Sequence, residues 1–126
     1  MPKLERGRII EAEVLDQQGR NPKRRRLVII TPTEEIEPGK PLVAVSITGT
    51  LPRPLTDEFV LLPFHPKGHP RTGLSKRSAA KCDWLCPIQH DDVLKISGIV
   101  PTAEVLEILE KVDALHKRSG GAPAVE

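Results

Sequence analysis

The chain has 126 residues, of which 38% are hydrophobic, enough for one domain with a modest core and too few for two ordinary domains. Its net charge of +2 does not by itself indicate a nucleic-acid partner. No stretch is long and apolar enough to span a bilayer, and the opening MPKLERGRII lacks the apolar segment of a signal peptide. We therefore expect no membrane association and a cytoplasmic location.

Short apolar runs separated by proline and glycine predict a sheet. The chain has two Phe, one Trp and no Tyr, so Val, Ile, Leu and Ala must fill the core, and the β-branched residues favour strands. The expected strands are residues 6–16, 25–32, 41–49, 58–64, 78–86 and 93–100. Strands this short, with turn signals between them, predict a small β-barrel or sandwich.

One helix is expected near the C-terminus, in PTAEVLEILEKVDALHKR. Thr102 is in the position of an N-cap, and Glu104 in the first turn complements the helix dipole. An apolar stripe at helical spacing should pack on the sheet; its members are Val105, Ile108, Leu109, Val112 and Leu115. We expect a single domain over residues 1–118 and a disordered tail over 119–126.

The stretch KCDWLCPIQH, residues 81–90, contains both cysteines and the tryptophan. In a strand, Cys82, Trp84 and Cys86 share the apolar face, and the two cysteine Cα atoms lie roughly 13 Å apart, beyond the disulfide limit of about 7 Å. Two thiols and His90 do not form a recognised zinc spacing. We therefore expect reduced core thiols, no metal and no cofactor, with the charged Lys81 and Asp83 exposed side by side.

Basic residues gather in two segments, RNPKRRR at 20–26 and HPKGHPRTGLSKRSAAK at 65–81. Either segment alone is typical of a solvated loop, but two that face one way would attract a phosphate backbone. His65 and His69, in the second segment, are expected to be exposed loop residues.

Polar residues on two strands suggest where such a surface would lie. In the strand 41–49, Ser46 and Thr48 share one face with Ala44, while Val43, Val45 and Ile47 share the other. If this strand neighbours 78–86, hydroxyl groups, Lys81 and Asp83 line one groove, which the basic residues 23–26 could close.

The chain resembles the MazF/PemK toxins, the sequence-selective endoribonucleases of bacterial toxin–antitoxin pairs. The resemblance covers roughly residues 5–115 and rests on RGRII, RRRLVIITP, VSITGT and GLSKRSAAKCDWL in this order and spacing. It continues from Asp83 to Gly98, Val100 and the final helix, with Ser97 in place of the family's isoleucine.

This resemblance implies a small Src-homology-three-like barrel with a C-terminal helix, of the type shared by MazF, PemK and CcdB, and commonly a homodimer. It also implies metal-independent cleavage of single-stranded RNA through a 2′,3′-cyclic phosphate, and a cognate acidic antitoxin as partner. By position, Arg25 is expected to stabilise the transition-state charge and is also a candidate for proton transfer, and Thr48 is expected to hydrogen-bond a phosphate oxygen. Asp83 is the candidate base and Lys81 a fourth catalytic candidate. The assignment among Arg24, Arg25 and Arg26 leaves the register open by one residue. The expected RNA-binding residues are Lys23, Arg24, Arg26, Lys76 and Arg77.

The chain departs from the family at three positions. Arg26 replaces a proline, Trp84 a glutamine and Cys86 an arginine. The last two changes remove a polar and a cationic RNA contact, and an inward Trp84 would not stack with bases, leaving Phe59 and Phe64 for that role. Two alternatives therefore stand beside the nuclease: a catalytically degenerate module that binds RNA or a protein, and a gyrase-binding toxin like CcdB, which should tolerate loss of Arg25.

Overall fold

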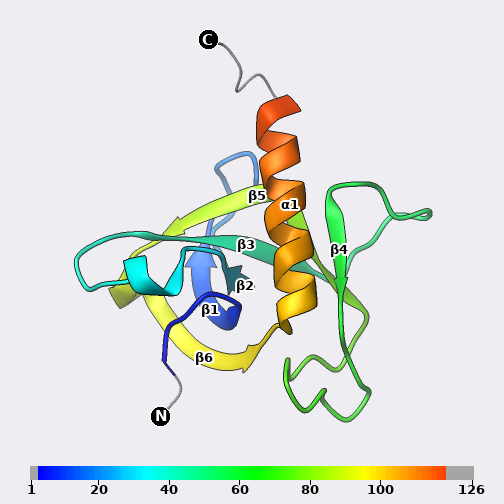
Figure 1. Cartoon of the computed structure of the whole chain (residues 1–126), viewed down its shortest axis with the longest axis horizontal. Coiled ribbons are helices and arrows are strands. Elements are labelled where there is room, and N and C mark those ends of the chain that lie inside the picture. The colour runs from blue at the N-terminus through cyan, green and yellow to red at the C-terminus, as the bar shows by residue number, and fades with distance from the viewer. Residues whose placement is uncertain (1–2, 119–126) are drawn as a thin grey trace.

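The computed structural model describes residues 3–118, so the expected tail at 119–126 lies outside the described residues. Its elements follow the order expected from the sequence (Figure 1). They are β1 (Arg8–Val14), β2 (Lys23–Ile29), β3 (Leu42–Thr48), β4 (Phe59–Leu62), β5 (Ser78–Ile88), β6 (Val93–Ile99) and α1 (Thr102–Arg118), with short 3₁₀ turns at Thr33–Glu35 and His90–Asp92. The predicted mainly-β fold with a C-terminal helix is confirmed.

The strands form a single antiparallel sheet in the order β4-β5-β3-β2-β1-β6. Strand β2 pairs with β1 on one side and with β3 on the other, and β6 pairs with the remaining edge of β1. Figure 1 shows the sheet curling around its core, with α1 lying across it. The expected barrel is not closed, because β4 and β6 stay at opposite ends of the hydrogen-bonded order.

Alternation along the strands separates the core into two clusters. One cluster packs beneath α1 and contains Ile9, Val28 and Val45. The other is on the opposite face of the sheet and contains the sequence neighbours of these residues, including Ile10, Leu27 and Ala44. The alternation expected for residues 41–49 is therefore confirmed.

Strand β5 changes face part-way along its length. Val45 of β3 pairs with Leu85, but Ile47 pairs with Ala80, so residues between these partners bulge out of the ladder. As a result Cys82 packs in the cluster beneath α1, whereas Trp84 and Cys86 pack with the other cluster. The prediction that these three side chains share one face is wrong, because it assumed an unbroken strand.

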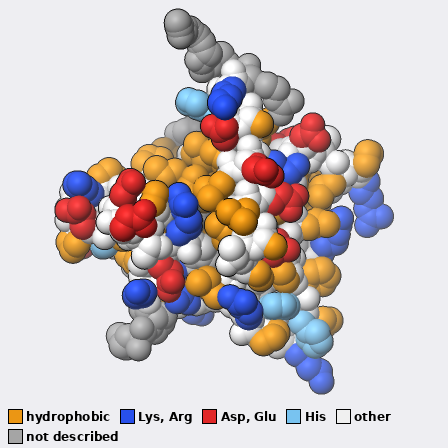
Figure 2. Space-filling view, viewed as in Figure 1, with side chains coloured by type: hydrophobic (Ala, Val, Ile, Leu, Met, Phe, Trp, Pro, Cys, Tyr) orange, Lys and Arg blue, Asp and Glu red, His pale blue; other side chains and the backbone are white. Residues whose placement is uncertain are grey.

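The helix packs as its sequence pattern predicts. Val105 and Ile108 are buried against the sheet, and Leu109, Val112 and Leu115 pack at the edge of the same cluster. On the face shown in Figure 2, acidic side chains follow the helix and hydrophobic side chains lie on both sides of it. Within residues 3–118, no helix combines the length and hydrophobicity needed to cross a membrane.

The loop between β4 and β5 is fastened to β6. The Ile99 amide donates a hydrogen bond to the Arg71 carbonyl, and the buried Thr72 hydroxyl donates to the Pro63 carbonyl. Gly98 lies directly against the backbone of Thr72, where any β-carbon would overlap the Thr72 carbonyl. This close approach fixes the loop that leads into Lys76 and β5.

Candidate functional site

A basic pocket of about 460 Å³ lies where β2, the end of β3 and the start of β5 meet. We define it by its lining residues 23–26, 47–50, Ser75, Lys76 and Ser78. Lysine, arginine and hydroxyl side chains dominate this lining, and it includes no carboxylate. Such a surface attracts an anion with several oxygen atoms, because the cations supply charge and the hydroxyl groups supply further hydrogen bonds.

Arg25 differs from the arginines on either side of it. It pairs across the sheet with the buried Ala12, so its side chain leaves β2 on the inner face and is half-buried. Arg24 instead forms a 2.7 Å ion pair with Glu11 and is exposed. This alternation distinguishes Arg25 from its neighbours, which sequence reasoning alone left open by one residue.

The Arg25 guanidinium lies over the indole of Trp84, with its Cζ atom 5.0 Å from the ring centre. This distance is typical of a cation–π contact. The Nε–H of Arg25 is buried and has no hydrogen-bond partner among the described residues. A buried donor in this state gains stability when an acceptor reaches it, because an unpaired polar group in a dry environment is costly.

Thr48 ends β3 and also lines the basic pocket. Its Oγ1 atom accepts a 3.1 Å hydrogen bond from the Thr50 amide. The contact uses the hydroxyl as an acceptor, so the hydroxyl proton remains able to donate. Arg25 and Thr48, which are far apart in the sequence, therefore present donors to one cavity.

The other two predicted catalytic residues do not line the basic pocket. Lys81 donates hydrogen bonds to Asp83 at 2.7 Å and to Gln17 at 2.8 Å, which links β5 to the β1–β2 loop. Asp83 lines a neighbouring pocket instead. Of the predicted RNA-binding residues, Lys23, Arg24, Arg26 and Lys76 line the basic pocket, and the Arg77 carbonyl adjoins it beside Gly49.

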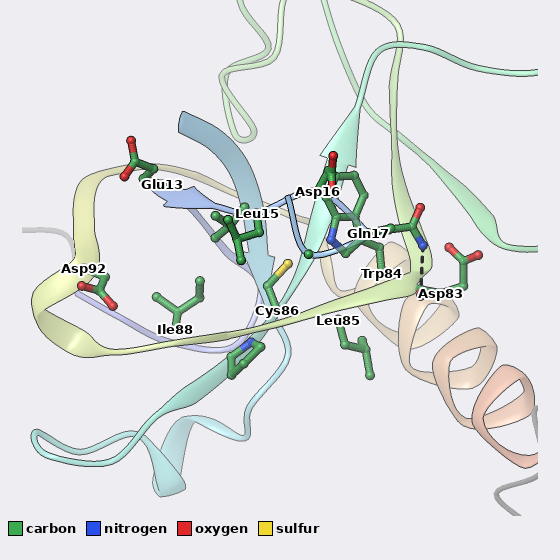
Figure 3. Close-up of a pocket in the computed structure, with 13 residues that line it drawn as sticks. Glu13, Leu15, Asp16, Gln17, Asp83, Trp84, Leu85, Cys86, Ile88 and Asp92 are labelled. Carbon is green, nitrogen blue, oxygen red and sulfur yellow. Dashed lines mark hydrogen bonds between the residues drawn. The ribbon is translucent and has the colours of Figure 1, made fainter. Parts of the chain in front are cut away.

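The neighbouring cavity, of about 480 Å³, is called the tryptophan pocket and is lined by residues 13–17, Gly19, 83–88 and Asp92 (Figure 3). In Figure 3, Trp84 and Asp16 lie near one end of this pocket, and Glu13 and Asp92 lie near the other. Trp84 is half-buried and borders the cavity, so it is not enclosed in the core as its assignment to the apolar face predicted. Sequence reasoning missed this position because the β5 bulge turns the strand between Cys82 and Trp84.

Asp16 organises the β1–β2 loop that forms one wall of the tryptophan pocket. Its carboxylate accepts hydrogen bonds from the Arg20 and Gln18 amides and from the Asn21 side chain. These hydrogen bonds lower the pKa of Asp16, and the bond from the Arg20 amide has the largest effect. The loop is therefore best ordered when this carboxylate is ionised.

Both cysteines are free and buried, in agreement with their predicted role as core thiols. Burial raises the pKa of Cys82 to about 12 and that of Cys86 to about 11. Neither is therefore a thiolate nucleophile at neutral pH. Among the described residues, no group of three or more His, Cys, Asp or Glu could hold a metal ion.

The loop histidines serve the local backbone. The Nδ1 atom of His65 accepts a hydrogen bond from the Lys67 amide, and that of His69 accepts from the Arg71 and Thr72 amides. Neither histidine lines the basic pocket or the tryptophan pocket. Their place in a loop, expected from the sequence, is confirmed.

Comparison with known proteins identifies the architecture. A solved mycobacterial endoribonuclease superposes with a TM-score of 0.63 at 17% identity, covering 99% of this chain and 98% of that one. A mycobacterial endoribonuclease in complex with its cognate antitoxin gives a TM-score of 0.65 at 18% identity, covering 98% of this chain and all of that one.

A chain of the MazE–MazF complex from Deinococcus radiodurans superposes with a TM-score of 0.67 at 17% identity, over 89% of this chain and 94% of that one. The fold is that of MazF. No family model matches the sequence, and no curated protein sequence matches it. The likeness to MazF is therefore one of backbone architecture, and the chemistry must be argued from the residues of this chain.

Proposed function

We propose that this protein is an endoribonuclease toxin that cleaves single-stranded RNA without a metal ion. The observation that carries the proposal is the convergence of Arg25, Thr48 and Lys76 on one basic pocket that no carboxylate lines. A phosphodiester fits this arrangement, since it carries one negative charge and two non-bridging oxygen atoms. The MazF-like fold of the chain supports the same reading.

In the proposed reaction, the ribose 2′-oxygen attacks the adjacent phosphorus and the bond from phosphorus to the 5′-oxygen breaks. The products are a 2′,3′-cyclic phosphate and a 5′-hydroxyl, and the proton lost by the 2′-hydroxyl is balanced by one delivered to the leaving oxygen. Arg25 stabilises the charge that develops on the phosphoryl oxygens, and Thr48 donates a hydrogen bond to one of them. RNA supplies its own nucleophile, so no serine or cysteine nucleophile is needed.

Proton transfer has two candidates. Arg25 is the first candidate, because it lines the basic pocket and its contact with Trp84 would hold it beside a bound phosphate. Asp83 remains the base that the family resemblance suggests, but it is paired with Lys81 and borders the other pocket. This separation favours a second candidate function, an RNA-binding module in which the phosphate site remains and the cleavage step is lost.

The partners follow from the same pocket. We propose single-stranded RNA as substrate in the cytoplasm, a homodimer as the working form, and an acidic antitoxin segment as inhibitor. Aspartate and glutamate side chains of such a segment would occupy the basic pocket and compete with RNA phosphates. A saturating antitoxin that leaves RNA binding unchanged would contradict this assignment.

The deciding experiment is incubation with mixed-sequence single-stranded RNA in excess EDTA, followed by end-group analysis. The variant is Arg25→Ala, and the matched control is Arg26→Ala, which removes the next guanidinium on the same strand. Cyclic-phosphate ends that Arg25→Ala reduces by about 100-fold or more, and Arg26→Ala by much less, are expected for the nuclease. RNA binding without cleavage would favour the binding module, and activity that survives Arg25→Ala would contradict the assignment of Arg25.

A further inference from the structure

Trp84 connects the basic pocket with the tryptophan pocket. One face of its indole is covered by Arg25, which lines the basic pocket, and the ring itself lines the tryptophan pocket. The two cavities are thus separated by two stacked planar groups. A ligand whose repeating unit contains a phosphate and a flat ring would fit these two adjacent cavities.

The tryptophan pocket combines apolar walls with acceptor groups. Leu15 and Leu85 are large apolar side chains that remain 48% and 41% exposed at its rim. Two of its carboxylates are already used, because Asp16 is bonded to its own loop and Asp83 to Lys81. Glu13 and Asp92 have no side-chain hydrogen bond or ion pair within residues 3–118, and Figure 3 shows both beside the cavity.

We propose that the tryptophan pocket is a nucleobase site, in which one base of the bound RNA packs on Trp84 while an adjacent phosphate occupies the basic pocket. This inference rests on the proposed RNA-binding function and adds a specificity-determining residue to it. The indole is the stacking surface, and Arg25 on its far side fixes the ring. Base stacking on aromatic side chains contributes strongly to the binding of single-stranded nucleic acid.

Charge explains why a base, and not the backbone, enters this pocket. The carboxylates at its rim repel phosphate, so the backbone is held on the basic side and only an uncharged ring is admitted. Ionised carboxylates accept hydrogen bonds and do not donate them. Bases with an amino group, such as adenine and cytosine, are therefore favoured over uracil.

The chain carries its own probe, because Trp84 is its only tryptophan and it has no tyrosine. Emission from the indole thus reports on Trp84 alone. We would titrate the intact protein with dye-labelled 2′-O-methyl oligonucleotides of adenine, cytosine or uracil, which lack the free 2′-hydroxyl required for cleavage. The control is an oligomer of equal length made of abasic sugar-phosphate units, and dye anisotropy measures binding independently of Trp84.

The expected result is that all oligomers bind, that those with bases quench Trp84 emission, and that the abasic one does not. Adenine and cytosine oligomers should bind more tightly than uracil; the reverse order would overturn the assignment of the carboxylates as acceptors. Equal emission changes with base-bearing and abasic oligomers would overturn the nucleobase site but leave the phosphate site intact. No binding of any oligomer would overturn the proposed function and this inference with it.

Two variants separate stacking from simple burial. Trp84→Leu keeps apolar bulk but removes the aromatic face, whereas Trp84→Phe keeps a smaller one, and circular dichroism checks that both are folded. Trp84→Leu should weaken the binding of base-bearing oligomers about 5- to 150-fold and that of the abasic oligomer much less, because only the contact with Arg25 affects the phosphate site. Trp84→Phe should lie between Trp84→Leu and the parent. Equal losses for both kinds of oligomer would show that Trp84 only positions Arg25. An emission response to a leucine-containing peptide and none to oligonucleotides would indicate a protein partner instead.

Discussion

Asp83 accepts a 2.7 Å hydrogen bond from Lys81 on the same strand, and neither residue borders the pocket that Arg25 and Thr48 share. The pair is partly exposed, with 21% of the Lys81 side chain and 39% of the Asp83 side chain accessible, so its contribution to stability is small. The family resemblance assigns a base to this position. The geometry makes that role the first assignment to test.

Asp83→Asn should therefore reduce RNA cleavage much less than Arg25→Ala does. The amide keeps the shape of the side chain and removes its charge, which isolates the proposed proton transfer. Single-turnover cleavage rates for the two variants make the comparison, and we expect less than a tenfold loss for Asp83→Asn against about 100-fold for Arg25→Ala. Equal losses of cleavage rate in the two variants would support Asp83 as the base.

The Thr48 hydroxyl should matter through its proton. Thr48→Val removes the donor and keeps the branched shape, and it should lower kcat by about 100-fold with little change in RNA affinity. Thr48→Ser retains a hydroxyl group and is the matched control, expected to keep most of the activity. If Thr48→Val weakens binding and leaves kcat unchanged, the hydroxyl stabilises the bound RNA and the transition state equally.

Lys76 is expected to contact a phosphate, since it lines the basic pocket. Lys76→Ala should weaken the binding of all single-stranded sequences to a similar degree and reduce the slope of log K against log salt by about 0.7–1. Lys117 is a matched control, because it is paired with Asp113 on the helix and lies outside the basic pocket. A Lys117→Ala variant with the same change in slope would show that the effect is one of net charge.

Gly98 should be intolerant of any side chain. A β-carbon there overlaps the Thr72 carbonyl, which belongs to backbone and cannot turn away. Gly98→Ala should lower the free energy of unfolding by about 1–3 kcal/mol, measured by urea denaturation. Gly49→Ala is the matched control, since the nearest atom to its β-carbon, the Arg77 carbonyl oxygen, is 3.9 Å away. Similar losses of stability in the two variants would mean that the contact with Thr72 is not the cause.

The buried thiols predict a loss of stability in alkaline solution. Folding raises the pKa of Cys82 from its ordinary 9.0 to about 12 and that of Cys86 to about 11. The unfolded chain therefore loses these protons first, and the thiol contribution to stability is complete below pH 9 and declines as the pH rises toward 11–12. Urea titrations of the parent and of a Cys82→Ala/Cys86→Ala variant across this range measure it. A parent and variant with the same pH dependence would contradict the prediction.

Local patterns were sufficient to predict the elements of this fold. Apolar side chains at helical spacing from Val105 to Leu115 marked α1, and alternation marked β3, because both depend only on residues near in sequence. Alternation also predicted that Thr48 and the basic residues 23–26 border one groove, but it placed Lys81 and Asp83 there as well, and neither lines the basic pocket. The open sheet was not predicted, since closure of the expected barrel depends on pairing between β4 and β6, which lie at opposite ends of the sheet.

The separation of Lys81 and Asp83 from Arg25 could not be predicted for a related reason. Whether β5 runs without a bulge is decided by its partners, and β3 pairs Val45 with Leu85 but Ile47 with Ala80. No residue type in KCDWLC marks that shift. The same bulge moved Trp84 from the face assigned to it by simple alternation to the wall of a pocket.

That bulge also makes β5 a member of both halves of the core. Cys82 lies beneath α1, while Cys86 lies in the opposite cluster close to Trp84. The helix and the tryptophan pocket are thus tied by one continuous strand and should unfold as a single cooperative unit. Loss of RNA binding after deletion of α1 would then report melting of the pocket, and would be no sign that the helix itself touches RNA.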